Sequence, residues 1–100
     1  MASAPDRVRL DKWLWAARFF RTRQLAAEAI NGGKVHLNGL RTKPGKEVKV
    51  GSRLRIHKGP LEWDIEILVL SSQRRPAIEA RTFYAESETS LLRRQQLTEE

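Results

Sequence analysis

Arginine and lysine are the side chains of this 100-residue sequence that bear most directly on chemistry. Nineteen Lys and Arg residues stand against 12 Asp and Glu residues, a formal net charge of +7. Residues 1–60 hold 14 basic and 4 acidic residues, a net charge of +10, and residues 61–100 hold 5 and 8, a net charge of −3. A basic half of this kind is typical of a surface that binds a polyanion, most often nucleic acid.

Side chains able to carry catalysis are few. The sequence has no cysteine, which excludes a disulfide framework, a thiolate zinc site and a cysteine nucleophile. His36 and His57 are expected at outward strand positions among basic residues, where a solvent-facing role is favoured over acid–base catalysis. Residues 32–34 read Gly-Gly-Lys but lack the spacing of a phosphate-binding loop. We therefore expect no enzyme activity, no metal site and no cofactor.

Two helices are predicted in the N-terminal third of the chain. Leu10, Trp13, Leu14 and Ala17 follow the spacing i, i+3, i+4, i+7, which predicts a helix over residues 7–20 with Asp6 as its N-cap. Thr22 is the predicted N-cap of a second helix, which ends at residues 31–33 because glycine readily adopts the left-handed C-cap conformation.

After residue 33 the apolar pattern changes to a period of two. It predicts strands over residues 35–37, 40–43, 48–50, 54–56 and 61–70, with a hairpin turn at Asn38-Gly39. Acidic residues of the last strand are expected to pair with basic residues of the strand before it. A polar connector, residues 71–75, then leads to a predicted helix over 77–86. The polar tail over 87–100 is expected to fray, although residues 91–97 could form a loose helical turn.

The predicted fold class is α+β: a two-helix motif packed on a small, mostly antiparallel sheet and followed by a C-terminal helix. The expected organisation is an N-terminal arm over residues 1–8, one domain over 9–70, and a connector, helix and tail over 71–100. Trp13 is expected in the core. Trp15 and Phe19 lie off the apolar stripe, where packing is favoured over stacking on bases.

Basic side chains from the two helices and the first hairpin are expected to share one face. They are Arg9, Lys12, Arg18, Arg21, Arg23, Lys34, Arg41, Lys43 and Lys46. Such charges bind phosphates, because neutralising the phosphates releases condensed counterions. Thr22, Gln24 and Asn38 could add hydrogen bonds to phosphate or sugar oxygens.

Several motifs, taken in order, resemble the S4 RNA-binding domain. They are residues 9–14 (Arg-Leu-Asp-Lys-Trp-Leu), Thr22-Arg23, residues 29–35 (Ala-Ile-Asn-Gly-Gly-Lys-Val), Asn38-Gly39 and Lys43-Pro44. Residues 13–19 and 73–77 also resemble a family of small bacterial, ribosome-associated heat-shock proteins. This family's members usually continue into a longer basic C-terminal extension, whereas residues 87–100 are not basic overall.

The resemblance implies a role on the ribosome. It implies binding to the free large ribosomal subunit that still carries a nascent chain on tRNA, and rescue or recycling of stalled subunits during heat stress. Ribosomal RNA of the large subunit is the implied ligand, with tRNA as a further partner. The family's RNA-binding motif falls on Arg9, Asp11, Lys12, Thr22, Arg23, Gln24, Lys34 and Asn38.

Other functions remain open at this point. A DNA-binding helix-turn-helix regulator is one, although Leu25, Ala26, Ala27, Ala29 and Ile30 offer bases few hydrogen-bond donors. A general RNA-binding adaptor, a protein-binding adaptor and an RNA-modifying enzyme are others, the last with little chain left for a catalytic domain. No apolar run approaches the roughly 20 residues that span a bilayer, so we expect no membrane contact and a cytoplasmic location. We also expect some non-specific DNA binding and a monomer.

Overall fold

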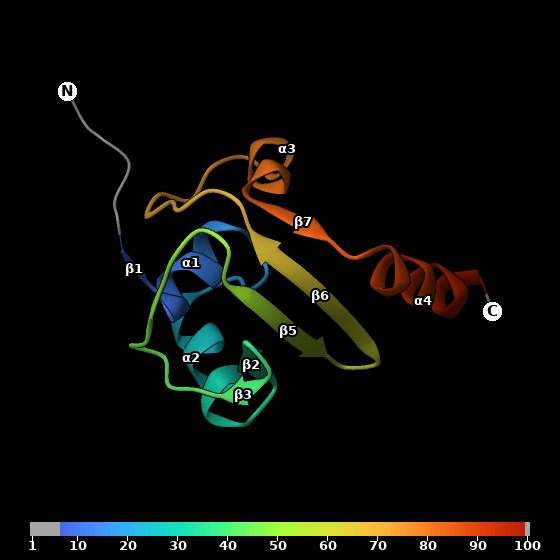
Figure 1. Ribbon diagram of the computed structural model, residues 1–100, viewed down its shortest axis with the longest axis horizontal. Coiled ribbons are helices and arrows are strands. Elements are labelled where there is room, and N and C mark those ends of the chain that lie inside the picture. Colours follow the sequence, from blue (N-terminus) through green and yellow to red (C-terminus); the bar gives the residue numbers. More distant parts are fainter. Residues whose placement is uncertain (1–6, 100) are drawn as a thin grey trace.

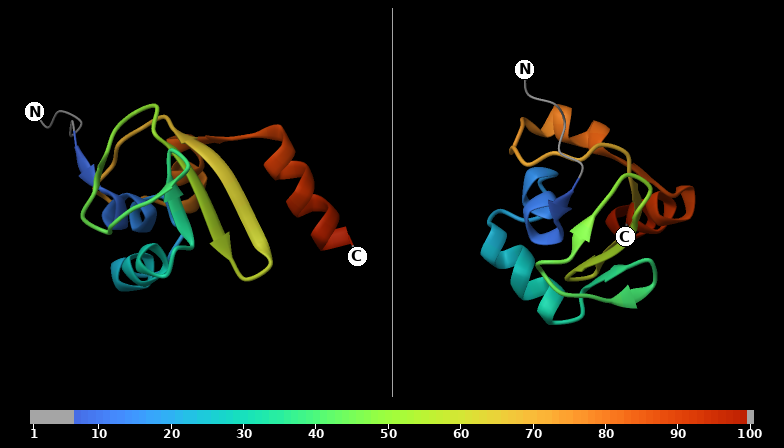
Figure 2. Two further views of the ribbon diagram at one scale, coloured as in Figure 1. Left: turned by 60° about the horizontal axis from the view of Figure 1, so that its bottom comes forward. Right: turned by 60° about the vertical axis from the view of Figure 1, so that its left-hand side comes forward.

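A computed structural model describes residues 7–99 of the chain (Figure 1). The elements in chain order are β1 (Val8–Arg9), α1 (Leu10–Ala16), α2 (Arg23–Asn31), β2 (Val35–Leu37), β3 (Leu40–Arg41), β4 (Glu47–Val48), β5 (Arg53–Lys58), β6 (Leu61–Ile67), α3 (Ala77–Ala80), a 3₁₀ turn (Arg81–Phe83), β7 (Tyr84–Glu86) and α4 (Glu88–Glu99). Helices α1 and α2 stand beside one end of the sheet, and α4 stands at the other end (Figures 1 and 2). None of the helices in this range is long and apolar enough to cross a membrane.

The principal sheet has the strand order β3-β2-β5-β6-β7, and every neighbouring pair in it is antiparallel. Its register sets apolar residues opposite one another: Val35 pairs with Ile56, and Leu54 pairs with Ile65. Strands β1 and β4 form a separate antiparallel pair. The predicted α+β class with a mostly antiparallel sheet is confirmed.

The core lies between the two N-terminal helices and one face of the sheet. The predicted helical stripe is buried, with Leu10, Trp13 and Leu14 at 0% exposure and Ala17 at 4%. The Trp13 indole N–H donates to the carbonyl of Val69 at 2.9 Å, which satisfies the polar atom of this buried ring. The stripe therefore places α1 against the chain that leaves β6.

Both aromatic residues outside the stripe pack within the protein, as favoured above. The Phe19 ring is buried, and its centroid lies 4.8 Å from that of Tyr84 and 5.8 Å from that of Trp63. The half-buried Trp15 ring is covered by Arg74, whose guanidinium carbon lies 5.8 Å from the ring centroid.

Helix α1 is shorter than the predicted helix over 7–20 at both ends. It begins at Leu10, because Val8 and Arg9 pair with β4 as a strand. It ends at Ala16, because Arg18 adopts a positive φ of 66° that a right-handed helix does not allow. Asp6, the predicted N-cap, lies outside the described residues, whereas Thr22 caps α2 as predicted by accepting the Leu25 N–H at 3.0 Å.

Each predicted strand is present, but some of the strands have other end points than predicted. The strand expected over 48–50 is Glu47–Val48 and pairs with β1 instead of the principal sheet. The longest strand, expected over 61–70, ends at Ile67. The Asn38-Gly39 turn is confirmed, since both residues have positive φ, 51° and 84°, as a tight hairpin turn requires.

Two predictions for the C-terminal third are wrong. The helix expected over 77–86 is helical only to Phe83, and Tyr84–Glu86 joins the sheet as β7 instead. The reason is the open edge of β6: the N–H groups of Leu68 and Val69 both donate to the Phe83 carbonyl, which draws the next residues onto that edge. The tail expected to fray forms α4, which docks on β6 through the buried Ser90.

Candidate RNA interface

The loop between β3 and β4 closes over the start of α1. The Leu10 N–H donates to the carbonyl of Lys46 at 2.8 Å, and the Asp11 N–H donates to the carbonyl of Pro44 at 3.1 Å. The first amides of a helix have no partner within the helix, so these two carbonyls cap α1. The backbone of this loop, from Lys43 to Lys46, is thereby held close to the first turn of α1.

Asp11 is the buried acid beneath this part of the surface, with 5% of its area exposed. Its carboxylate accepts two hydrogen bonds from Arg9, at 3.2 and 3.0 Å, and Arg23 Nη2 lies 3.5 Å from Oδ1. The hydrogen bond and the negative charge of Asp11 raise the pKa of Arg9 above its ordinary value. Because the Arg9 and Arg23 side chains stay 54% and 43% exposed, both still offer N–H groups to a ligand.

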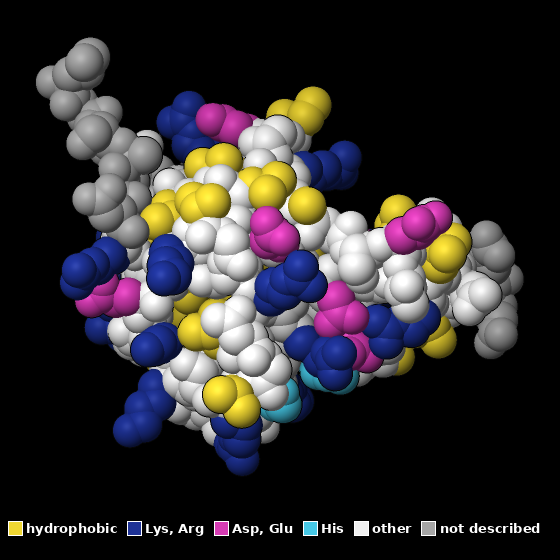
Figure 3. Space-filling view, viewed as in Figure 1, with side chains coloured by type: hydrophobic (Ala, Val, Ile, Leu, Met, Phe, Trp, Pro, Cys, Tyr) yellow, Lys and Arg dark blue, Asp and Glu magenta, His cyan; other side chains and the backbone are white. Residues whose placement is uncertain are grey.

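Four lysines join these two arginines without an acidic partner. Lys12, Lys34, Lys43 and Lys46 make no ion pair with any acidic side chain that the structure describes. We call Arg9, Arg23 and these lysines the basic surface. In Figure 3 dark-blue side chains stand with few acidic neighbours along the margin around β1, α2 and β3. Cations with few acids to neutralise them are what a polyphosphate requires.

Four of the predicted contact residues have structural roles of their own. Thr22 caps α2, and the Asn38 Oδ1 atom accepts the Arg53 N–H at 3.0 Å. Arg41 donates to the carbonyl of Asn31 at 3.1 Å, at the C-terminal end of α2. Gln24 Nε2 lies 3.5 Å from an oxygen of Glu28 on the solvent side of α2. These contacts fix the two-helix motif and the hairpin beside the basic surface.

Arg18 and Arg21 lie in the joint between α1 and α2, whereas Asp11 and the two arginines that contact it lie around the start of the two helices. Arg18 Nε donates to the carbonyl of Arg75 in the connector after β6. Arg74, from the same connector, donates to the carbonyls of Trp15 and Phe20. Sequence reasoning missed Arg74, which it placed in a polar connector; the run Arg74-Arg75 was the signal available.

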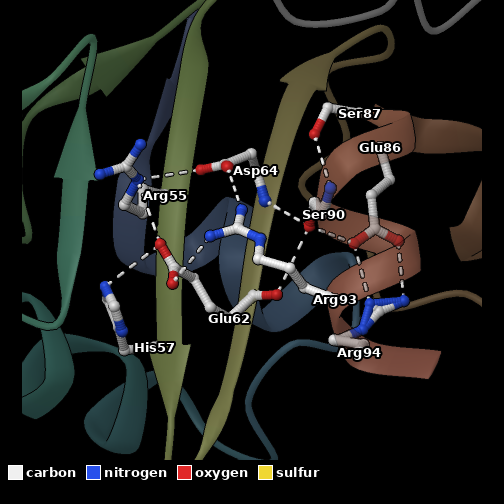
Figure 4. A network of polar contacts seen from close by, with 9 residues as sticks. All are labelled: Arg55, His57, Glu62, Asp64, Glu86, Ser87, Ser90, Arg93 and Arg94. Atoms are coloured by element: carbon white, nitrogen blue, oxygen red, sulfur yellow. Dashed lines mark hydrogen bonds and ion pairs between the residues drawn. The ribbon is translucent and has the colours of Figure 1, made fainter. Parts of the chain in front are cut away.

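A different part of the surface carries paired charge. Arg55 on β5 pairs with Asp64 on β6 at 3.0 Å, and Arg93 of α4 reaches the same carboxylate at 2.8 Å (Figure 4). The hydrogen bond to Asp64 raises the pKa of Arg55 above its ordinary value, with its charge adding to the effect. Glu62 forms an ion pair with Arg55 at 3.3 Å and accepts a hydrogen bond from Arg93 at 3.4 Å. The predicted cross-strand charge pairs are confirmed, and they neutralise the arginines of this region.

No group of His, Cys, Asp and Glu side chains that could hold a metal ion occurs among the described residues. His36 is half-buried on β2, and His57 lies 3.6 Å from Glu62 at the end of β5.

Comparison with known proteins assigns the family. Residues 8–54 match the S4 domain, the range that carries both N-terminal helices and the β2–β3 hairpin. The heat shock protein 15 homolog of Aeromonas salmonicida is 49% identical over 98 residues, which are 98% of this chain and 74% of that protein. The chain belongs to the heat shock protein 15 family. Heat shock protein 15 of Escherichia coli K12 is likewise 49% identical, over 90% of this chain and 68% of that protein.

Two further relatives agree with this assignment. A solved structure of heat shock protein 15 from Vibrio cholerae, described as trimeric, matches with a TM-score of 0.86 and 49% identity over 90% of this chain and 91% of that chain. An RQC P-site tRNA stabilizing factor of Listeria innocua is 36% identical over 84 residues, 82% of this chain and 91% of that protein. The S4 domain and these relatives make the chain an RNA-binding protein of a ribosome-associated type.

Proposed function

We propose that this protein binds ribosomal RNA of a free large ribosomal subunit that still carries a nascent chain on tRNA, and that it aids rescue or recycling of such stalled subunits during heat stress. The observation that carries the proposal is the basic surface, in which Arg9 and Arg23 share the single carboxylate of Asp11 and the lysines have no acidic partner among the described residues. The heat shock protein 15 relatives support the ribosomal setting.

The proposed binding is a docking of shape and charge without a catalytic step. Arg9 and Arg23 donate from oriented guanidiniums, which suit the bidentate recognition of phosphate. Lysines of the basic surface add flexible point charges around them. Because grooves of double-stranded RNA are recognised mainly by shape, phosphates and 2′-hydroxyls, this surface suits structured RNA without base readout.

The tRNA is the proposed second partner. Support comes from the Listeria relative, whose name states that it stabilises tRNA in the P site. The proposal includes a cytoplasmic location, because the proposed partner is the ribosome. It also includes a monomer, because a single chain supplies every residue of the basic surface. Since the Vibrio relative is described as trimeric, analytical ultracentrifugation of this protein with and without RNA would settle its oligomeric state.

Co-sedimentation with separated ribosomal subunits tests the proposal. The wild-type protein should sediment with large subunits, and more so with subunits that carry peptidyl-tRNA than with empty ones. Raising the salt should release it, because each phosphate contact adds roughly 0.7–0.9 to the slope of log affinity against log salt. Binding that is independent of salt would contradict the proposal.

A paired set of charge-reversal variants locates the interface. The double variant Arg9→Glu with Arg23→Glu should abolish co-sedimentation. The control, Arg53→Glu with Arg81→Glu, makes the same change in net charge outside the basic surface and should retain most of the co-sedimentation. Duplex DNA of equal length serves as the competing ligand. If DNA binds as tightly as structured ribosomal RNA, the alternative of a DNA-binding regulator is favoured instead.

A further inference from the structure

The joint between α1 and α2 is held by cations that come from distant parts of the chain. Arg74 Nη1 donates to the carbonyls of Trp15 and Phe20, and its guanidinium lies over the Trp15 ring. Lys58, at the end of β5, donates to the carbonyl of Phe19 at 2.7 Å. These carbonyls lie at or beyond the C-terminal end of α1, where cations are favoured by the helix dipole.

Arg18 occupies a strained position in this joint. Its φ of 66° lies in the left-handed region, which arginine rarely adopts and which glycine adopts freely where a helix ends. The Phe19 N–H donates to the Leu14 carbonyl at 3.0 Å, a bond typical of such a helix end. A strained backbone at an exposed residue, whose side chain does not fill the core, calls for a functional explanation.

Arg18 and Arg74 also stand close together without an acidic partner. Burial lowers the pKa of Arg74 below its ordinary value, and the charge of Arg18 lowers it further. Neither arginine forms an ion pair with the acidic side chains of the described residues, whereas the neighbouring Arg75 pairs with Glu79 at 3.0 Å. Backbone carbonyls hold both guanidiniums, but no acidic side chain of the described residues offsets the repulsion between them, so an anion would stabilise this site.

We propose that Arg18 and Arg74 form a second phosphate-binding site, at the opposite end of α1 from Asp11, that takes a phosphate group of the same RNA. The proposal rests on the proposed function, because it assumes that the basic surface binds RNA. Helix α1 spans seven residues, or about 10 Å at 1.5 Å per residue, so the two sites would grip separate phosphates. Arg74 lies beyond residues 8–54, and the connector after β6 thus becomes part of the RNA-binding surface (Figure 1).

Arg18→Gly and Arg18→Asn test the site with little risk to the fold. Glycine and asparagine both tolerate the left-handed conformation, so each variant removes the guanidinium and keeps the backbone. We expect a thermal midpoint close to that of the wild-type protein. For large-subunit ribosomal RNA, we expect about tenfold weaker binding at fixed salt and a salt slope lower by roughly 0.7–0.9, the value of one phosphate contact.

Arg53→Gln is the matched control. It removes one positive charge, as the Arg18 variants do, from an arginine that lies 3.9 Å from Glu66. Equal weakening by Arg53→Gln and Arg18→Gly would show a general effect of net charge and would overturn the second site. So would unchanged binding by Arg18→Gly while Arg9→Glu with Arg23→Glu abolishes it. If the wild-type protein fails to bind the RNA, the proposed function falls and the second site with it.

Nuclear magnetic resonance of the wild-type protein provides a test without any variant. The side-chain Nε–H signals of Arg18 and Arg74 should shift when the RNA is added, and the Nε–H signal of Arg53 should stay. Unmoved signals of Arg18 and Arg74 in an RNA complex that shifts Arg9 and Arg23 would overturn the site and leave the proposed function standing.

Discussion

Substituting Asp11 by asparagine is the sharpest test of the basic surface, because two explanations of RNA binding predict opposite signs. The substitution raises the net charge from +7 to +8. If affinity followed total charge alone, the RNA would bind more tightly. If Asp11 acts by orienting Arg9 and Arg23, as its three contacts indicate, the RNA binds more weakly.

The structure sets the size of the expected effect. Asp11 orients two long side chains, and without it both must be ordered when RNA binds. Ordering one such side chain costs about 0.5–1.5 kcal/mol, so that two cost about 1–3 kcal/mol. The added unit charge offsets part of this, by about 1 kcal/mol or less for a phosphate at 4 Å through water. The expected net loss is about 1–2 kcal/mol, or about 5- to 30-fold in Kd.

Fluorescence anisotropy with a labelled fragment of large-subunit ribosomal RNA, at one fixed salt concentration, measures the effect. Glu47→Gln is the control, because it changes the net charge equally from a residue paired with Arg7 at 3.6 Å. We expect this control to bind as tightly as the wild-type protein or slightly more tightly. If Asp11→Asn binds as tightly as Glu47→Gln and remains folded by circular dichroism, Asp11 does not position the two arginines.

Three further predictions concern the fold that carries the surface. Gly33→Ala should lower the free energy of unfolding, measured in urea, by about 1–2 kcal/mol, because φ of Gly33 is +77° and the new Cβ would lie 3.3 Å from the Arg41 guanidinium. Gly45→Ala is the control, because its Cβ would make only ordinary contacts, and its free energy of unfolding should be nearly that of the wild-type protein. Ser90→Ala removes the hydrogen bonds that dock α4 on β6. It should lower the free energy of opening of α4, measured by amide hydrogen exchange, by about 1–3 kcal/mol. Thr89→Ala, on the exposed side of α4, should leave the exchange unchanged. Burial and then the charge of Glu86 raise the pKa of Tyr84 above its ordinary value of 10.0. The unfolded chain therefore loses this proton at a lower pH than the folded protein, and the free energy of unfolding falls as the pH rises above that value. In urea titrations at alkaline pH, Tyr84→Phe should show a smaller decrease of the free energy of unfolding with pH than the wild-type protein.

Local signals account for the parts of the fold that were predicted well. The Thr22 cap, the end of α2 at glycine and the Asn38-Gly39 turn each depend on conformations that a few neighbouring residues decide. The α1 stripe likewise needs only the 3.6-residue period to predict its buried face. Sequence patterns are informative wherever the contacts that matter lie within one turn or one hairpin.

Contacts between distant residues account for the parts that were not predicted. Residues 84–86 carry no alternation that marks a strand, and they become β7 because the edge of β6 is open to them. Helix α4 has only three apolar residues among its twelve, and it docks because Ser90 and Arg94 both hydrogen-bond to Glu86. Such pairings depend on the positions of residues that are distant in the sequence, and a local sequence pattern contains no information about those positions.

The candidate site divides in the same way. Composition and spacing predicted which residues carry the charge, but not what each side chain does. Burial makes Asp11 a support for two arginines, and a backbone carbonyl turns Arg41 toward the end of α2. The part played by Arg74 depends on a connector that returns to α1 after more than fifty residues, as its hydrogen bonds to Trp15 and Phe20 show.

The distribution of acids explains why one face of the molecule attracts a polyanion. The carboxylates of β6 and β7 neutralise the arginines of β5 and α4 through short ion pairs. The basic surface has the single buried carboxylate of Asp11 for its two arginines and, within the described residues, none for its lysines. Since paired charges produce little field at a distance and unpaired ones of like sign add, the potential that steers RNA comes from the side of α1 and α2.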